Sequence, residues 1–130
     1  MSDFTQIFSI AASGMRAQSQ RLQHVSENIA NTDTPGYRKK SVNFEQIMNN
    51  GIPTGEVVTG KVSTSAAALA EIHDPGHPLA NDAGYYDGSN VDLVIEIADA
   101  REAQRSYEAN LKIFEQARKM SSALNDLLRR

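Results

Sequence analysis

The chain has 130 residues, a formal net charge of −3, a mean hydropathy of −0.44, no cysteine and no tryptophan, and 6% of its residues are aromatic. A chain of this length forms at most one ordinary domain, and the scarcity of large aromatic side chains disfavours a large compact core. The composition excludes disulfides and thiolate chemistry, and no apolar run approaches the roughly 18 residues that a direct membrane span requires.

The charges are distributed unevenly along the chain. Residues 41–100 contain nine acidic residues and one basic residue, whereas residues 101–130 contain seven basic and four acidic residues. Duplex nucleic acid binds a continuous basic face, so this distribution predicts no nucleic-acid partner. The N-terminus lacks the basic segment and the long apolar segment of a secretory signal. We therefore expect any export to proceed without a cleaved signal peptide.

A heptad pattern predicts a helix of about 28 residues at the N-terminal end. Its apolar positions alternate at intervals of four and three, interrupted by Gln18, and comprise Phe4, Phe8, Ala11, Met15, Leu22, Val25 and Ile29. Ser2 or Asp3 can cap the first turn, because their side-chain oxygens accept hydrogen bonds from free backbone amides.

The segment from Glu27 to Tyr37 is expected to end this helix. Thr34-Pro35-Gly36-Tyr37 has the composition of a type II turn, because proline presets φ at the second position and glycine supplies a positive φ at the third. Asn28 and Asn31 are expected to bond the last free carbonyls of the helix and the amides of the turn. Taken locally, the motif predicts a helix stop and no more.

Glycine and proline interrupt the middle of the chain, and the helical period disappears there. Alternating residues from Lys40 to Phe44 predict one half-buried strand, and residues 56–64 predict a second, with a turn at Asn49-Asn50-Gly51 between them. Residues 66–72 are ambiguous, because their alanines favour a helix whereas their surroundings favour an extended segment. The extended conformation is the one we expect.

The C-terminal end predicts a longer helix, from about residue 90 to residue 128, which would be on the order of 55 Å long. Ser89 with Asp92 fits a capping box, with Ser89 as the N-cap. One apolar stripe comprises Leu93, Ile97, Ala100, Tyr107, Leu111 and Phe114, and passes through Gln104; a second, offset stripe comprises Ile113, Ala117, Met120, Leu124 and Leu127.

These patterns predict a mainly α fold, in which two long terminal helices form an antiparallel coiled-coil-like hairpin beside a small β-rich or irregular middle segment. The expected divisions are residues 1–31, 32–89 and 90–130. A lone hairpin buries one seam on each helix and the longer helix overhangs, so the surplus apolar surface would attract partners. An ordinary three- or four-element helical bundle, with the middle folded back as a cover, remains the alternative.

The motif at the end of the first helix resembles the N-terminal signature of the flagellar rod and hook axial protein family. Members carry a helix that ends in an Asn-Ile-Ala-Asn element followed by Thr-Pro-Gly-Tyr, which here is Asn28 to Asn31 and Thr34 to Tyr37. The segments 73–80, 84–85 and 90–92 resemble the middle of a rod protein of this family. Residues 105–110, Arg-Ser-Tyr-Glu-Ala-Asn, resemble its C-terminal helix motif. The resemblance covers nearly the whole chain in the right order.

The resemblance implies a structural subunit of the proximal rod of the bacterial flagellar basal body, which polymerises through its terminal helices and transmits torque. Its implied partners are other rod proteins, copies of itself and the flagellar export apparatus, and its implied location is the periplasmic rod. The turn residues Asn28, Asn31, Thr34, Pro35, Gly36 and Tyr37 would fix the start of the hairpin. The implied helix-packing residues are Phe4, Phe8, Met15, Leu22, Val25, Ile29, Ile97, Tyr107, Asn110, Leu111, Phe114, Met120, Leu124 and Leu127.

Two other functions would use parts of the same sequence. A soluble helical adaptor or chaperone could bind one partner through the same stripes. A metal-dependent hydrolase would need a metal site at His73 and His77, but Pro75 and Gly76 prevent a helix there and no third ligand is evident. No catalytic arrangement has a recognisable spacing, so we expect no enzyme activity, no cofactor and no metal.

Overall fold

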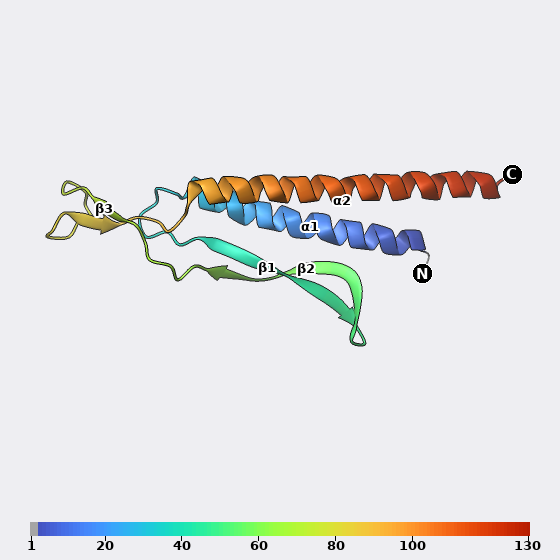
Figure 1. Cartoon of the computed structure of the whole chain (residues 1–130), viewed down its shortest axis with the longest axis horizontal. Helices are drawn as coiled ribbons and strands as arrows, with labels where there is room; N and C mark the ends of the chain where they lie inside the picture. Colours follow the sequence, from blue (N-terminus) through green and yellow to red (C-terminus); the bar gives the residue numbers. More distant parts are fainter. Residues whose placement is uncertain (1–2) are drawn as a thin grey trace.

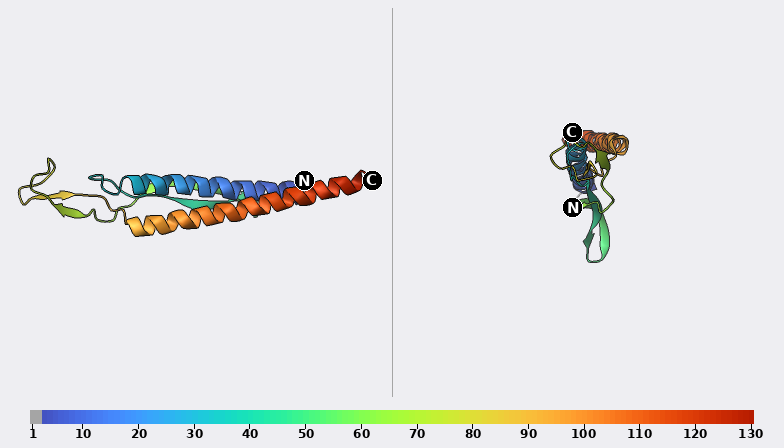
Figure 2. Two further views of the ribbon diagram at one scale, coloured as in Figure 1. Left: turned by 90° about the horizontal axis from the view of Figure 1, so that it is seen from above. Right: turned by 90° about the vertical axis from the view of Figure 1, so that its left-hand side faces the viewer.

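Two antiparallel helices and a β-hairpin are stacked in three layers along a rod-shaped molecule. The computed structural model describes residues 3–130. The elements are α1 (Asp3–Ala30), β1 (Lys40–Asn49), β2 (Ile52–Thr64), β3 (Glu71–His73), β4 (Tyr85–Asp87) and α2 (Leu93–Leu128). Helix α1 is the middle layer, with α2 on one side and the β1–β2 hairpin on the other, while β3 and β4 lie beyond the ends of both helices (Figure 1, Figure 2). The predicted mainly α fold with a small β-containing middle is confirmed.

The β1–β2 hairpin turns at Asn50 and Gly51, where φ is 51° and 81°. Two successive positive φ values match the right-handed twist of antiparallel strands, which is why an Asn-Gly pair suits this turn. Both predicted strands exist and are longer than expected, pairing from Lys40 with Thr64 to Asn49 with Ile52. Residues 66–70 form no helix, and residues 71–73 form β3, as the extended alternative predicted.

Helix α2 begins at Leu93 and is capped by Asp92, so the prediction of Ser89 as the N-cap is wrong. The Asp92 carboxylate accepts hydrogen bonds from the amides of Val94 (3.1 Å) and Ile95 (3.4 Å). The Ser89 hydroxyl is buried and donates instead to the carbonyl of Thr32, two residues after the end of α1. It joins two distant segments rather than starting the helix. At the other end of the chain, Asp3 lies in the first turn of α1, and Ser2, the other expected cap, lies outside the described residues.

Small and polar residues form the contact between α1 and α2. Ala11 and Ala17 of α1 and Ala103 of α2 are each 1% exposed, and Ala117 is 4% exposed. A Cβ placed on Gly14 would lie 2.9 Å from the side-chain amide atoms of Asn110, so the Asn110 side chain occupies the space that a side chain at position 14 would need. Helices separated by such small residues pack at the short end of the usual interaxial range.

The buried line of α2 lies one residue before the first expected stripe, and joins the second expected stripe at Ala117. Glu96, Ala103 and Ala117 are buried and Asn110 is half-buried, at intervals of seven residues. A shift of one residue is about 100° around a helix, so it turns most of the expected large side chains away from α1. Phe114 is the exception, because its ring packs against Phe8 of α1. Four of the expected side chains remain exposed: Leu93 (43%), Ile97 (41%), Tyr107 (40%) and Leu111 (37%).

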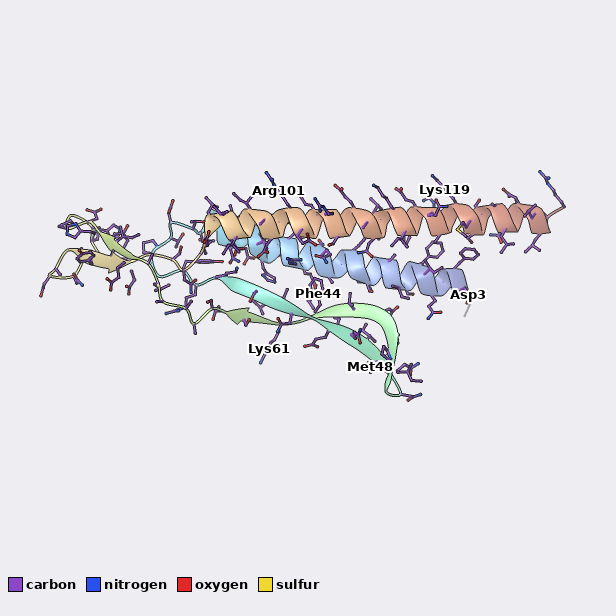
Figure 3. All side chains as sticks on the ribbon, viewed as in Figure 1. Asp3, Phe44, Met48, Lys61, Arg101 and Lys119 are labelled. Carbon is purple, nitrogen blue, oxygen red and sulfur yellow. The ribbon has the colours of Figure 1, made fainter. Side chains whose placement is uncertain are left out.

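Helix α2 also extends past the first residues of α1, as the different helix lengths predicted (Figure 1). Its charged side chains Arg101 and Lys119 point away from α1 (Figure 3). None of the helices in residues 3–130 combines the length and apolar character that crossing a membrane would need.

Candidate assembly interface

The turn after α1 has the predicted geometry and contacts residues 87–88, which lie just before α2 in the chain. The amide of Tyr37 donates to the carbonyl of Thr34 (3.2 Å), and Gly36 has φ of 74°, as a type II turn requires. Pro35 is exposed in the turn. The amide of Gly36 donates to the carbonyls of Asp87 (3.3 Å) and Gly88 (3.1 Å), so the turn is held against the end of β4.

Asn28 is the central residue of the junction between the turn, β1 and α2. Its side chain is 0% exposed. Its amide nitrogen donates to the Lys40 carbonyl (2.8 Å) and to Oε2 of Glu96 (3.1 Å). Its amide oxygen accepts from the Tyr37 hydroxyl (2.8 Å) and from the Lys40 amide (2.9 Å). A primary amide offers two donors and two acceptor sites, so all four are used.

The other polar residues of the motif bond more locally. The Asn31 side chain donates to the carbonyl of Glu27 (2.8 Å) and accepts from the Thr34 hydroxyl (3.0 Å), so it closes the helix end as predicted. The prediction for Asn28 is wrong in its partners, because its side chain bonds residues beyond the turn and on α2 rather than the end of its own helix. The Thr32 hydroxyl, which the sequence did not single out, donates to the carbonyls of Asn28 and Ile29.

A buried ion pair joins the start of α2 to the segment that follows the turn. Glu96 is 0% exposed, and its Oε1 lies 2.6 Å from Nζ of Lys39. Asp99 lies 3.9 Å from the same Lys39 nitrogen and 3.6 Å from the guanidinium of Arg21 on α1. A buried carboxylate is tolerated only when paired and hydrogen-bonded, and Lys39 and Asn28 meet both conditions.

Glu96, Lys39 and Asn90 also belong to this junction, although they were not predicted there from the sequence. Asn90 accepts from the Lys39 amide (2.7 Å) and donates to the carbonyls of Ser65 and Ala67, so it links three parts of the chain. The signal for Glu96 was present, because it lies seven residues before Ala103 on the line of small residues. A charged residue on a packing line predicts a buried polar contact.

Tyr37 has the one clear pKa shift among residues 3–130. Burial raises the pKa of its hydroxyl above the usual value of 10.0. The positive charge of Lys40 opposes this shift, and the carboxylates of Glu27 and Glu96 add to it. The neutral phenol is therefore the form that the junction favours, consistent with its role as the donor to Asn28.

The helix-packing residues expected from the sequence fall into two groups. Those of α1, together with Asn110 and Phe114 of α2, are buried or half-buried within the chain, and the rings of Phe8 and Phe114 pack 5.0 Å apart at 51°. The buried or half-buried members on α1 are Phe4, Phe8, Met15, Leu22, Val25 and Ile29. The remaining α2 members are exposed: Ile97, Tyr107, Leu111, Met120, Leu124 and Leu127.

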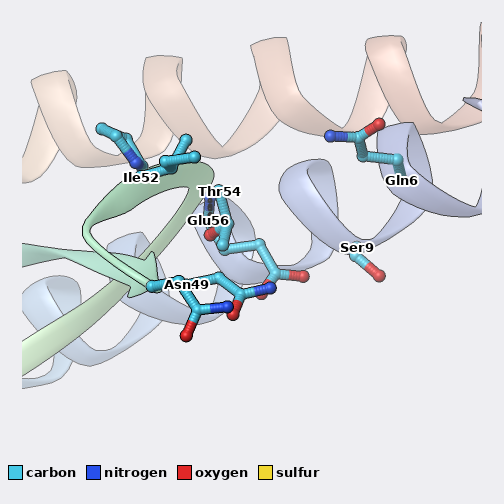
Figure 4. A pocket seen from close by; sticks show the side chains of 8 residues that line it. Gln6, Ser9, Asn49, Ile52, Thr54 and Glu56 are labelled. Atoms are coloured by element: carbon cyan, nitrogen blue, oxygen red, sulfur yellow. Dashed lines mark hydrogen bonds between the residues drawn. The ribbon is translucent and has the colours of Figure 1, made fainter.

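The histidine loop and the pocket at the β1–β2 turn contain no arrangement typical of catalysis. The ring of His73 packs against Tyr85 and that of His77 against Tyr86, with centroids 4.7 and 3.9 Å apart. No cluster of three or more potential metal ligands occurs within residues 3–130. An open pocket between α1 and the hairpin turn is lined mainly by polar side chains, among them Gln6, Ser9, Asn49, Thr54 and Glu56 (Figure 4).

A hairpin of two long helices, closed at one end by a buried polar junction and exposing large apolar side chains along α2, defines a structural protein that functions in an assembly. Comparison with known proteins identifies that assembly. Residues 8–38 match the family described as flagella basal body rod protein, and residues 82–127 match the family described as flagellar basal body rod FlgEFG protein C-terminal.

Curated relatives match over most of the chain. The chain is 41% identical to the flagellar basal-body rod protein FlgC of Agrobacterium fabrum over 127 residues, covering 92% of this chain and 91% of that protein. It is 38% identical to FlgC of Escherichia coli O6:H1 and 34% identical to FlgC of Buchnera aphidicola from Acyrthosiphon pisum, in each case over 88% of this chain and 90% of the relative. The chain belongs to the FlgC family of flagellar basal-body rod proteins.

This family membership confirms the resemblance found in the sequence. The chain is a structural rod subunit of the flagellar basal body that assembles with other rod components. The adaptor and hydrolase alternatives are not favoured by these comparisons.

Proposed function

We propose that the chain adds to the rod by burying the exposed apolar stripe of α2 against helices of neighbouring subunits, copies of itself among them. The observation that carries this proposal is that two different faces of α2 carry two different kinds of residue. Small residues make the contact with α1, while Leu93, Ile97, Tyr107 and Leu111 stay 37–43% exposed on the adjacent face. A monomer gains nothing from a row of half-exposed large side chains, whereas a polymer buries them.

Close packing also provides the mechanical property that a rod needs. Interdigitated side chains have low compressibility and transmit strain, and contacts repeated over many subunits share the load. In this proposal the contribution of the chain is mechanical, and none of its residues has a catalytic role. Torque passes through the packed helices.

The turn motif has a positioning role in the same proposal. Asn28, Asn31 and the turn Thr34 to Tyr37 hold the end of α1 against β1 and the start of α2. This junction sets the rotation of α2 about its axis, because Glu96 on the buried line is bonded directly to Asn28. The junction therefore decides which face of α2 is presented to neighbours.

The test replaces apolar residues of the stripe with polar residues of similar size. Ile97→Gln and Leu111→Gln are expected to leave the urea midpoint of the purified chain nearly unchanged, because both side chains are already partly exposed. The same variants, as the sole copy in the flagellated source bacterium, should abolish motility and give basal bodies without a complete rod.

Glu102→Gln is the matched control, because it changes an exposed residue of the same helix outside the stripe. Control cells should swim normally. Normal rods and swimming in cells that carry both stripe variants would disprove the proposed surface.

We further propose that the chain reaches the periplasmic part of the basal body through the flagellar export apparatus, without removal of an N-terminal segment. The support is the family resemblance. Disabling the export ATPase should retain the chain in the cytoplasm, and the mass of chain from purified basal bodies should match the full translated sequence. Recovery of a shortened chain would contradict this route.

A further inference from the structure

The C-terminal part of α2 carries an apolar surface that α1 does not cover. A groove at the start of α1 is lined by Phe4, Ile7, Ile113, Ala117 and Met120. From there α2 continues beyond α1 (Figure 1). Its last ten residues, 119–128, span about 15 Å. In this groove and overhang, Met120, Leu124, Leu127 and Leu128 are 53, 46, 65 and 77% exposed.

Basic side chains surround this apolar surface. Residues 118–130 contain four exposed basic residues, Arg118, Lys119, Arg129 and Arg130, and one acidic residue, Asp126. Basic Lys112 lines the groove, and exposed Asp3 and Glu115 lie next to it. This end therefore combines apolar contact area with positive charge. A partner that fits it has the opposite charge beside apolar side chains of its own.

The opposite end of the molecule has that complementary chemistry. The β3–β4 region lies at the far end of the long axis (Figure 1), where Glu71, Asp74, Asp82 and Asp87 are exposed. Residues 62–100 contain no lysine or arginine. Exposed apolar side chains accompany the acidic ones: Ile72 (38%), Leu79 (64%) and Tyr85 (42%).

The strand register at this end adds an independent observation. Glu71 is paired directly with Asp87 across the two strands. Like charges that face each other across a strand pair are destabilising, and no contact within the chain explains why this pair is kept. A basic surface docked on this pair would relieve the repulsion.

We propose that the basic, apolar overhang of α2 docks on an acidic, apolar subunit end of the kind that this chain carries at β3–β4, so that rod subunits stack end to end. The inference rests on the proposed rod function and names a second contact for it, separate from the side-by-side contact along Ile97 and Leu111. Such a head-to-tail contact is heterologous, since each subunit uses two different surfaces. It therefore supports open-ended growth.

The test uses the whole chain as its own partner, because both ends are present on it. Two charge-reversal variants are compared by sedimentation equilibrium at about 50 mM salt, where the Debye length exceeds 10 Å and surface charges act strongly. One reverses the basic end with Lys119→Glu, Arg129→Glu and Arg130→Glu. The other reverses the acidic end with Glu71→Lys, Asp82→Lys and Asp87→Lys, which leaves Asp74 in place because its carboxylate holds the amide of Gly76.

The wild-type chain is expected to self-associate with a strength that falls as salt increases. Each variant alone should associate at least tenfold more weakly, since it brings like charges together at both ends. An equimolar mixture of the two variants should restore association, because every end then meets its opposite. Circular dichroism of each variant establishes that it is folded.

Reversal of Arg16, Lys61 and Arg101 to Glu is the matched control, because it makes the same change in net charge away from both ends. This control should associate more strongly than the basic-end variant. A wild-type chain that stays monomeric up to about 1 mM, a mixture as weak as either variant, or a control as weak as the basic-end variant would overturn the end-to-end contact. These results would leave the motility test of Ile97 and Leu111 unaffected, so the two proposals fail separately.

Discussion

Replacement of the fully buried Asn28 by alanine is expected to lower the free energy of unfolding of the helical hairpin by a large amount. The substitution removes four hydrogen bonds in one step, one of them to the buried carboxylate of Glu96. A neutral hydrogen bond contributes about 1 kcal/mol net and a bond to a charged group about 1.5–3 kcal/mol. Lys40 and Tyr37 are half-buried and can rebond to water, which lowers the total.

The expected loss in the free energy of unfolding is about 3–5 kcal/mol, a large part of the roughly 5–15 kcal/mol typical of a natural domain. The measurement is urea unfolding followed by far-ultraviolet circular dichroism, at a concentration where the chain is monomeric. Asn31→Ala is the matched control, because Asn31 belongs to the same motif and makes one hydrogen bond to a helix carbonyl and one to an exposed hydroxyl. Its expected loss is about 1 kcal/mol.

A second variant tests the geometry rather than the number of bonds. Asn28→Asp keeps the shape of the side chain but places a second carboxylate next to Glu96. The two carboxylates would lie about 3.1 Å apart, which is the present distance between the Asn28 amide nitrogen and Oε2 of Glu96. It should destabilise at least as much as alanine, and Glu96→Gln in the same chain should recover part of the loss by supplying a donor. Equal losses for Asn28→Ala and Asn31→Ala, or no recovery by Glu96→Gln, would refute the central role of Asn28.

Three further predictions concern the turn, the junction and the helix contact. Gly36→Val should cost about 1–2 kcal/mol of stability and impair swimming, because φ is 74° while the space around an added Cβ is open; Gly76→Val, at a position without positive φ, should have little effect. The wild-type chain is expected to lose stability above pH 10.0, and the Tyr37→Phe variant should not show this loss. The pKa of Tyr37 is raised in the folded chain, so the unfolded chain ionises first and the contribution of this residue declines as pH rises through the folded value. Gly14→Val should cost about 1–3 kcal/mol, and less when Asn110 is alanine, because the added atoms meet the Asn110 side chain.

Each of these predictions has a direct control. Urea midpoints between pH 8 and 11 should converge for wild type and Tyr37→Phe, whereas exposed Tyr107→Phe should follow the wild type throughout. Parallel curves for wild type and Tyr37→Phe would disprove the role assigned to burial of that phenol. Equal costs of Gly14→Val with and without Asn110→Ala would show that the two residues do not meet.

Local pattern was sufficient for both helices, the β1–β2 hairpin and the turn after α1, whereas the short strand β4 was not predicted. The heptads of the two terminal helices, the Asn50-Gly51 hairpin turn and the Pro35-Gly36 turn follow from backbone preferences of nearby residues, and the structure has all of them. The family signature was readable for the same reason, because its residues are consecutive. The overhang of α2 followed from helix length alone.

Tertiary structure decided the face of α2 and the partners of Asn28. The large apolar residues of the heptad pattern predicted a seam through Ile97 and Leu111. The chain instead brings Gly14, Ala11 and Ala17 of α1 against the line of Ala103 and Ala117, because closely approaching backbones need small side chains on both helices.

The N-cap and the buried ion pair were decided in the same way. Ser89 and Asp92 are equally good capping residues by type, and the choice of Asp92 follows from the distant Thr32 carbonyl that Ser89 bonds. Glu96 and Lys39 lie 57 positions apart in the sequence and meet only when the turn docks on α2. The sequence by itself thus determined the two helices, the strands of the β1–β2 hairpin and the turns, since these depend on neighbours along the chain. Which apolar stripe stayed free for assembly depended on contacts between segments far apart, and only the folded hairpin determines it.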